Sequence, residues 1–467
     1  MSNKQNKRTV FKDAALADGV GEFGGKYGNQ YDVIVDDGVI ESIIPFDPVP
    51  EISLEKRYGK GAKVIDCNGL ALMPGLIDLH VHFRDPGFTQ KEDIRSGSRA
   101  AAAGGFTTVV CMPNTDPAID SKKTLLDVDR KGREAGYVNL LVAPAMSKGQ
   151  KGKKLTDLQM LTEAKTRCSE LTGRGIAAVS EDGRSLMDDA LMRQVSESAA
   201  SLGLPVFDHA EDASLSGGVM NEGAVSRRLA VRGIPARAEE NIIERDIKLA
   251  RETGAKFLIQ HVSTERGAAL IAKAKRELGE DAFCGETCPH YFILTEEAVA
   301  DKLSLAKMNP PLRTEGDRRA VLSAILKKQG GLDVVSTDHA PHTKKEKSKP
   351  LAEAPFGIVG LETSFPLSLT WLHIYCGMGL SALSWKMSGR PAQILGMKDR
   401  GRMKEGFVAD LALFDLNTTF EIDSSTFFSK GKNTPFDGLQ VKGKTVLTML
   451  GGKATFKNKE YMGRWHP

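Results

Sequence analysis

The run from Met73 to Pro86 (MPGLIDLHVHFRDP) places the strongest constraint on the fold, because it combines a buried strand with potential metal ligands. The apolar stretch ends in a histidine, a valine and a second histidine. Side chains two residues apart on a strand point the same way, so His80 and His82 should aim both imidazoles at one point. Such a pair is typical of a metal site, and Arg84, next in the alternation, would hold an anion beside it. The tripeptide alone leaves open that the two histidines are ordinary polar residues at a strand end.

The size and charge of the chain narrow the function classes. Its 467 residues, 41% of them apolar, suffice for a large barrel with an appended module. The 64 basic and 60 acidic residues leave a net charge of +4, which favours neither nucleic-acid nor membrane binding. The first residues lack the apolar core of a secretory signal, and no run reaches the ~20 apolar residues of a membrane span. We therefore expect a cytoplasmic protein.

Two other features carry no chemistry of their own. Six cysteines are scattered without the spacing of a disulfide framework or a zinc ribbon, so we expect them to be reduced and mostly buried. The glycine-rich residues 19–28 lack the spacing of a phosphate-binding loop, and Tyr27 stands where a serine or threonine should follow the lysine. We interpret that stretch as a loop or turn.

Eight short apolar runs, separated by helix-like segments, predict an α/β fold that closes into a parallel (β/α)8 TIM-like barrel. The runs are apolar throughout, as expected for strands covered on both faces. They span residues 70–83, 106–113, 137–146, 175–182, 205–212, 256–263, 282–292 and 332–341.

The two ends of the chain predict a second, smaller module. Residues 31–44 (YDVIVDDGVIESII) alternate around an Asp-Gly turn, and strand-like runs return after about residue 395. Neither end is large enough for a robust core alone. We therefore expect residues 1–67 and 395–467 to form one β-sandwich beside a metal-dependent barrel of residues 68–394.

Metal-competent side chains follow five of the eight runs. In a barrel these ends meet on one face, where catalytic groups lie. The residues are His80, His82, Asp182, His209, His261 and Asp338. Six ligands exceed the needs of one tetrahedral zinc, but two metals about 3.5–4 Å apart that share a carboxylate would use them all and activate a bridging water. Asp338 would ligate one metal and act as the catalytic acceptor of the water's proton.

Four motifs together resemble the dihydroorotases of the amidohydrolase superfamily. They are HVHFRDPG, PNTDP from Pro113, NPPLR from Asn309 and TDHAPH from Thr337, and the resemblance covers nearly the whole chain. It implies the barrel and β-sandwich, and the reversible, zinc-dependent hydrolysis of (S)-dihydroorotate to N-carbamoyl-L-aspartate in pyrimidine biosynthesis. The rival interpretations are another cyclic amidase, of hydantoinase or allantoinase type, and a non-catalytic scaffold for aspartate transcarbamoylase. The resemblance also leaves open a homodimer and an association with that transcarbamoylase.

The resemblance implies a ligand set of two zinc ions per chain. His80, His82 and Asp338 would hold one zinc, and His209 and His261 the other. Many relatives bridge the metals with a carboxylated lysine after the fourth strand, but this chain has Ser-Glu-Asp-Gly at 180–183 and no lysine nearby. One bacterial branch has Thr-Asp-Asp-Gly there and uses an aspartate. We expect Asp182 to be the bridge, with Glu181 as the alternative, since a strand register can slip by one residue.

The resemblance also implies the substrate contacts. Arg84 would grip the substrate carboxylate through paired hydrogen bonds, unless it forms a surface ion pair with Asp85 or Asp93. The other expected contacts are His82, Asn114, Asn309, His342, Phe356 and Gly357. Asn114 and Asn309 each lie next to a proline and could instead serve in turns. The charged segment 343–355 is expected to be a mobile lid over the site or a solvated loop without a catalytic part.

Overall fold

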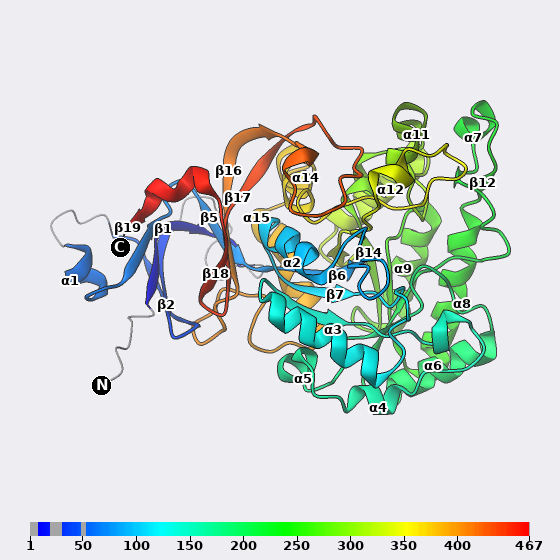
Figure 1. Cartoon of the computed structure of the whole chain (residues 1–467), viewed down its shortest axis with the longest axis horizontal. Coiled ribbons are helices and arrows are strands. Elements are labelled where there is room, and N and C mark those ends of the chain that lie inside the picture. The colour runs from blue at the N-terminus through cyan, green and yellow to red at the C-terminus, as the bar shows by residue number, and fades with distance from the viewer. Residues whose placement is uncertain (1–7, 19–29, 48–52, 467) are drawn as a thin grey trace.

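The computed structural model of the chain describes residues 8–18, 30–47 and 53–466. The glycine-rich stretch 19–28 lies outside them. Figure 1 shows two parts, a module of strands drawn from the N- and C-terminal segments and a larger body in which helices surround strands. None of the helices described is long and apolar enough to cross a membrane.

Eight parallel strands form the predicted barrel. They are β6 (Leu76–Val81), β7 (Phe106–Cys111), β8 (Asn139–Val142), β9 (Val179–Ser180), β10 (Pro205–Asp208), β13 (Lys256–Ile259), β14 (Phe283–Thr287) and β15 (Val334–Val335). Hydrogen bonds join these strands in the order β6-β7-β8 in one sheet and β9-β10-β13-β14-β15 in another. Parallel bridges between Ala145 and Ser180 and between Val81 and His339 connect the two sheets at both edges. The strands therefore close into a cylinder, which confirms the predicted barrel.

Helices cover the outside of the barrel. The longer ones are α2 (Ile94–Ala103), α3 (Lys122–Ala135), α6 (Asp189–Ser201), α8 (Arg237–Thr253), α9 (Glu265–Leu278) and α12 (Glu315–Leu326). Their ends follow local chemistry: the Asp188 carboxylate accepts from two backbone N–H groups at the start of α6, and Gly254, with φ of +71°, ends α8. Each longer helix thus returns the chain from one barrel strand to the next.

The short elements fill the connections. The helices are α1 (Leu54–Tyr58), α4 (Leu158–Thr162), α5 (Arg167–Thr172), α7 (Ala224–Arg228), α10 (Pro289–Ile293), α11 (Glu297–Lys302), α13 (Lys344–Lys347), α14 (Ser364–Ser368), α15 (Leu380–Ser384) and α16 (Arg390–Leu395). The strands β11 (Met220–Asn221) and β12 (Gly233–Ile234) pair in a loop after β10. α14 and α15 continue into π-helical turns over Leu369–Tyr375 and Trp385–Gly389.

The expected first strand over 70–83 is wrong in its first half, because the chain changes sheets at Gly75. β5 (Ala71–Pro74) pairs with strands of the module formed by the two terminal segments, called the end module below, and the barrel begins with β6. The Gly75 N–H donates to the Asp410 carbonyl, and a Cβ at this position would lie 2.2 Å from the Thr107 side chain. Glycine permits this close crossing. The sheet of the end module therefore extends into the residues expected for the barrel.

The end module joins strands from both termini into one branched sheet around its own core. Its strands are β1 (Thr9–Leu16), β2 (Gln30–Asp36), β3 (Val39–Pro45), β4 (Lys63–Asp66), β5, β16 (Leu411–Glu421), β17 (Gln440–Leu450), β18 (Lys453–Lys457) and β19 (Trp465–His466). β2 and β3 form the hairpin expected over 31–44. β5 lies between β1 and β16, so the N- and C-terminal segments share one folded unit, the predicted β-sandwich.

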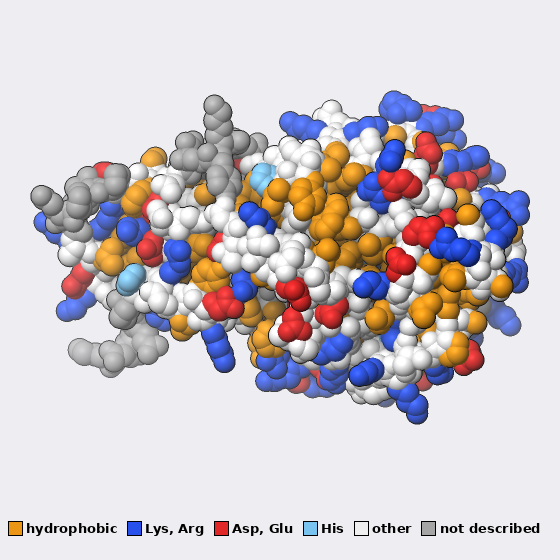
Figure 2. Space-filling model, turned by 90° about the horizontal axis from the view of Figure 1, so that it is seen from above, with side chains coloured by type: hydrophobic (Ala, Val, Ile, Leu, Met, Phe, Trp, Pro, Cys, Tyr) orange, Lys and Arg blue, Asp and Glu red, His pale blue; other side chains and the backbone are white. Residues whose placement is uncertain are grey.

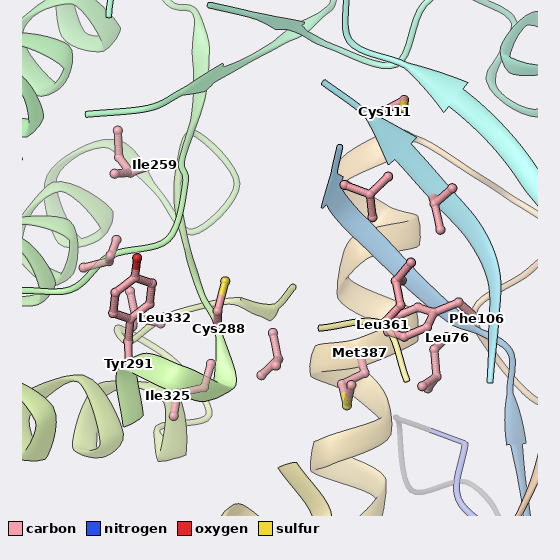
Figure 3. Packing of buried hydrophobic residues seen from close by; sticks show 14 of the residues in the cluster. Leu76, Phe106, Cys111, Ile259, Cys288, Tyr291, Ile325, Leu332, Leu361 and Met387 are labelled. Atoms are coloured by element: carbon pink, nitrogen blue, oxygen red, sulfur yellow. The ribbon is translucent and has the colours of Figure 1, made fainter. Parts of the chain in front are cut away.

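Two apolar clusters hold the barrel. One lies between the strands and the helices. On one side of the view in Figure 3, Leu76 and Phe106 pack near Leu361 and Met387, and Tyr291 and Ile325 lie on the other side of the view. The other draws residues from all round the cylinder and therefore fills its interior. It includes Ile77, Leu79, Val110, Leu141, Ala178, Phe207, Leu258, Cys284 and Val334. This filled interior leaves polar side chains to gather at the carboxyl ends of the strands.

The surface agrees with the near-balanced charge of the sequence. On the face seen in Figure 2, Lys and Arg side chains are intermixed with Asp and Glu around apolar areas. The six cysteines are all free, five of them are buried and Cys376 is exposed.

Candidate active site

The structure brings the six predicted ligands together at one end of the barrel. His80 lies in β6 and His82 directly after it, and the other four side chains follow β9, β10, β13 and β15. All six residues are buried. They are His80, His82, Asp182, His209, His261 and Asp338.

Asp182 lies at the centre of this group. Its Oδ1 is 3.2 Å from His80 Nε2, and its Oδ2 is 3.3 Å from His82 Nε2. On the other side Oδ1 is 3.4 Å from His209 Nδ1 and 3.8 Å from His261 Nε2. Asp182 thus belongs to two triads whose ligand atoms lie within 4.8 Å of one another, one with His80 and His82 and one with His209 and His261. A carboxylate shared in this way has the placement of a bridge between two metal ions.

Glu181, the alternative to Asp182, points elsewhere. Its carboxylate accepts hydrogen bonds from the backbone N–H (3.0 Å) and the hydroxyl of Ser147. Gln150 donates to the backbone carbonyls of Glu181 and Asp182, which fixes the turn between the two acids. Glu181 therefore lies outside both triads.

Asp338 lies on the side of the first triad. Its Oδ1 is 3.0 Å from His82 Nε2 and 3.6 Å from His80 Nε2. Burial alone would raise the pKa of Asp338, but the neighbouring histidines outweigh it and hold the pKa well below its usual range. Asp338 has φ of +47° and His261 has φ of +36°, conformations that non-glycine residues rarely adopt. Backbone strain of this kind is concentrated at functional sites.

Three of the four histidines are oriented by an acceptor behind the ring. An oxygen that only accepts holds the proton on the rear nitrogen and leaves the other nitrogen free to bind a cation. The pairs are His80 Nδ1 with Glu286 (3.0 Å), His82 Nδ1 with the Asn114 side-chain oxygen (2.8 Å) and His209 Nε2 with Glu211 (3.3 Å).

The donor set fits divalent metal ions. The buried Nε2 of His80 lies 3.2 Å from Asp182 Oδ1, but no described residue forms a hydrogen bond with good geometry to it. Burial opposes protonation of His209, yet the hydrogen bonds with Asp182 and Glu211 raise its pKa to about 10. The carboxylates of Asp182 and Glu211 favour a positive charge on His209, because negative charges with little access to solvent need compensation. Imidazole nitrogens and carboxylate oxygens are the ligands that metal ions such as zinc take, and a bound ion would replace those protons.

Arg84 stands beside this cluster without an acidic partner. Its Nη2 lies 3.5 Å from His342 Nε2, its buried Nε has no hydrogen-bond partner, and it forms no ion pair within the part of the chain described. The two surface partners considered for it are taken, since Asp85 pairs with Lys131 (2.6 Å) and Asp93 with Lys430 (2.5 Å). The guanidinium therefore remains available to an anion.

His342 and the loop at 356–357 form the wall next to Arg84. The Nε2–H of His342 donates to the carbonyl of Phe356 at 2.7 Å. Burial first, and then the charges of Arg84 and the nearby lysines, lower the pKa of His342 to about 2, so the ring is neutral. Gly357 has φ of +123°, and a Cβ there would lie 2.6 Å from the Ala340 Cβ. The loop thus approaches the His342 segment closely.

The two predicted asparagines contact the neighbours of the ligands. Asn114 accepts from His82, as described above, and lies against Gly183. The Nδ2 of Asn309 donates to both carboxylate oxygens of Glu211 (3.0 Å each), while its Oδ1 is buried without a partner. Both asparagines therefore line the site.

Sequence reasoning missed the residues behind the ligands. Glu286 lies in β14, and Glu211 comes two residues after His209. An acid inside an apolar run, as in FCGET, is the signal that would have found Glu286. The segment 343–355 is not a solvated loop throughout: it begins with α13, whose buried Lys347 donates to the carbonyls of Pro355 (3.0 Å) and Gly357 (2.9 Å).

Comparison with known proteins agrees with this geometry. The family model described as "Dihydro-orotase-like" matches residues 69–267. A dihydroorotase of Geobacter metallireducens is 44% identical over 90% of this chain and 96% of its own length. One of Acetivibrio thermocellus is 40% identical over 92% of this chain and 95% of its own. The chain belongs to the dihydroorotase family.

The solved structures that resemble this dihydroorotase family member confirm its architecture. An L-hydantoinase (dihydropyrimidinase) from Arthrobacter aurescens superposes with a TM-score of 0.78 at 25% identity over 96% of both chains. A D-hydantoinase superposes with a TM-score of 0.77 at 22% identity over 97% of this chain and 96% of its own. The chain therefore shares the fold of cyclic-amide hydrolases along nearly its whole length.

Proposed function

We propose that this chain is a dihydroorotase that interconverts (S)-dihydroorotate and N-carbamoyl-L-aspartate in pyrimidine biosynthesis. The observation that carries the proposal is Asp182, a single carboxylate shared by two histidine pairs at the carboxyl end of the barrel. Dihydroorotases more than 40% identical to the chain over most of its length support the substrate. We infer a cytoplasmic enzyme, in keeping with the free cysteines.

The proposed cofactor is a pair of zinc ions. His80, His82 and Asp338 would hold one ion, His209 and His261 the other, and Asp182 both. Bound zinc supplies Lewis acidity at the amide carbonyl and lowers the pKa of the attacking water. The orientation of His80 by Glu286 and of His209 by Glu211 supports this assignment, because each pair leaves one nitrogen facing Asp182.

Asp338 is the proposed proton carrier. Its Oδ1 lies 3.0 Å from His82 Nε2, and an ionised carboxylate at this position would accept the proton of the water that attacks the ring carbonyl. As the ring C–N bond breaks, the same proton passes from Asp338 to the leaving nitrogen. In the reverse reaction Asp338 would take the proton of the attacking nitrogen and return it to the hydroxyl oxygen, which leaves as water.

Arg84 and His342 are the proposed contacts of the substrate carboxylate. Arg84 offers a planar pair of donors and has no competing acid among the described residues. His82, Asn114, Asn309 and the backbone at Phe356–Gly357 complete the proposed contacts. A free Oδ1 on Asn309 supports a hydrogen bond from a ring N–H.

A hydantoinase-type activity is the second candidate, because the solved structures that match the fold carry that name. Arg84 argues against it, since an uncharged ring leaves a partly buried guanidinium without a counter-charge. A scaffold without activity is the third, and the complete set of six ligands argues against it. Association with a second copy or with an aspartate transcarbamoylase stays a prediction.

Steady-state assays of the purified protein separate these candidates. Dihydroorotate, hydantoin, dihydrouracil and allantoin are compared as substrates, and zinc is counted by elemental analysis. We expect turnover of dihydroorotate, about two zinc ions per chain, and loss of activity on chelation that added zinc restores. Turnover of only the other three rings would identify a different cyclic amidase. A zinc-free protein that stays inactive with added zinc would identify a scaffold.

A further inference from the structure

We propose that Asn433, which lies in the C-terminal segment and outside the barrel, is a positioning residue for the substrate carboxylate. The inference rests on the proposed function, because it concerns the wall formed by His342 and Phe356–Gly357 in that same site. Asn433 does not face the metal ligands. It acts on the backbone of the two loops that carry the wall.

The side-chain amide of Asn433 joins these loops by three hydrogen bonds. Its Nδ2 donates to the carbonyl oxygens of Ala340 (3.1 Å) and Gly357 (3.0 Å). Its Oδ1 accepts from the backbone N–H of His342 (3.0 Å). Asn433 is only 3% exposed, so water does not replace these bonds. An amide is the neutral group that offers two donors and an acceptor at once, which explains why asparagine suits this position.

The segment that carries Asn433 is itself held on the barrel. In Figure 1 the orange-to-red connection between β16 and β17 leaves the sheet and crosses to the barrel. Gly431 permits the contact, because a Cβ there would lie 2.6 Å from the Pro341 Cβ. The Ser429 hydroxyl donates to the buried carboxylate of Glu92, and the Ser429 N–H donates to Glu362 (3.1 Å). These contacts place the segment independently of the Asn433 side chain.

Asn433 therefore decides where the His342 ring and the Phe356 carbonyl stand relative to Arg84. The backbone N–H of His342 donates to Asn433 Oδ1, and the His342 ring donates to the carbonyl of Phe356. The next carbonyl, that of Gly357, accepts from both Asn433 and Lys347. If the Asn433 amide is lost, the His342 ring and the Phe356 carbonyl should move relative to Arg84. The metal ligands should keep their positions, because other residues hold them.

Asn433→Asp is the sharpest test, because it keeps the size and the acceptor but replaces two donors by a carboxylate oxygen. We expect KM for dihydroorotate to rise about tenfold or more while kcat changes less than about threefold. The matched control is Asn417→Asp. Asn417 is an exposed residue of β16 in the end module, and its side chain donates to the carbonyl of Gly69. Its KM should stay that of the parent enzyme. Zinc content should be equal in all three proteins.

Gly431→Ala tests the same contact without changing a polar group. The added methyl group pushes the segment away from Pro341, so we expect KM to rise as in Asn433→Asp. If Asn433→Asp folds poorly, this variant carries the test. The inference would be overturned if the folded variants had the same KM as the parent enzyme. It would also be overturned if kcat fell about tenfold while KM stayed unchanged.

Amide hydrogen exchange separates this inference from the proposed function. In substrate-free protein, the N–H of His342 should exchange faster in Asn433→Asp than in the parent. The new carboxylate oxygen is repelled by the carbonyls of Ala340 and Gly357, so the retained acceptor is no longer held against the His342 N–H. The measurement needs no turnover. An inactive parent enzyme would overturn the proposed function, whereas unchanged exchange at His342 would overturn the role of Asn433.

Discussion

Glu286 accepts a hydrogen bond from Nδ1 of His80 at 3.0 Å, although the two residues are 206 positions apart in the chain. Glu286 is fully buried in β14 and also accepts from the Ser336 hydroxyl (2.9 Å). A carboxylate behind an imidazole fixes which nitrogen carries the proton and makes the other a better ligand. The relationship ties the first triad to β14, which is separated from β6 only by β15 in the cylinder.

Glu286→Gln should weaken zinc binding by about 10- to 100-fold, because the amide keeps the shape but removes the charge behind His80. Competition with a chromophoric chelator measures the affinity. Glu297→Gln, an exposed residue paired with Arg228, is the control and should bind zinc as the parent does. Equal affinity in both variants would mean that Glu286 does not act on the metal.

Asp182→Asn should abolish the binding of at least one zinc ion per chain and nearly all turnover, since the shared carboxylate is lost. Glu181→Gln should retain the metal, because Glu181 contacts Ser147 and no ligand. Elemental analysis of the two purified proteins decides. The opposite pattern would assign the bridge to Glu181.

Asp338→Asn should lower kcat by about 10³-fold while the protein stays folded, because an amide cannot carry the proton to the leaving nitrogen. Asparagine tolerates the left-handed backbone at this position, where φ is +47°, so strain is not added. Near-ultraviolet circular dichroism checks the fold and steady-state kinetics the rate. Normal turnover would remove Asp338 from the proton path.

Arg84→Lys should raise KM for dihydroorotate about tenfold with a smaller change in kcat, since an ammonium keeps the charge but loses the paired donors. The control is Arg130→Lys on the exposed face of α3, where Arg130 pairs with Asp127 and Glu134. A KM unchanged from the parent would mean that the substrate carboxylate binds elsewhere.

His342→Gln should reduce the loss of stability that the protein undergoes between pH 7.5 and pH 5. Burial lowers the pKa of His342 from 6.5 to about 2, so between those values the unfolded chain binds more protons than the folded one. Stability therefore falls as the pH drops below 6.5, and His342 accounts for about 2 kcal/mol of that loss by pH 5. Chemical unfolding at pH 7.5 and pH 5 should show a smaller difference for the variant. The same substitution at exposed His466 should leave the difference unchanged.

Much of the barrel was predictable because its signals are local. A strand buried on both faces has a continuous run of apolar residues, and a metal-ligating side chain at its end interrupts that run. His80 and His82 share a side by strand periodicity alone. The junction at Gly75 was not predictable in this way, because one apolar run supplies both β5 of the end module and β6 of the barrel. Only the neighbouring strands decide where one sheet ends.

By itself, the sequence determined an α/β barrel with a shared terminal module and six candidate ligands at the strand ends, because apolar periodicity and residue spacing act over a few positions. Tertiary structure decided that Asp182 and not Glu181 faces the histidines, that Glu286 stands behind His80, and that Asn433 holds the wall beside Arg84. These relationships depend on side chains that meet across the cylinder. The direction of a side chain at a strand end is set by the packing of distant segments, which no local pattern records.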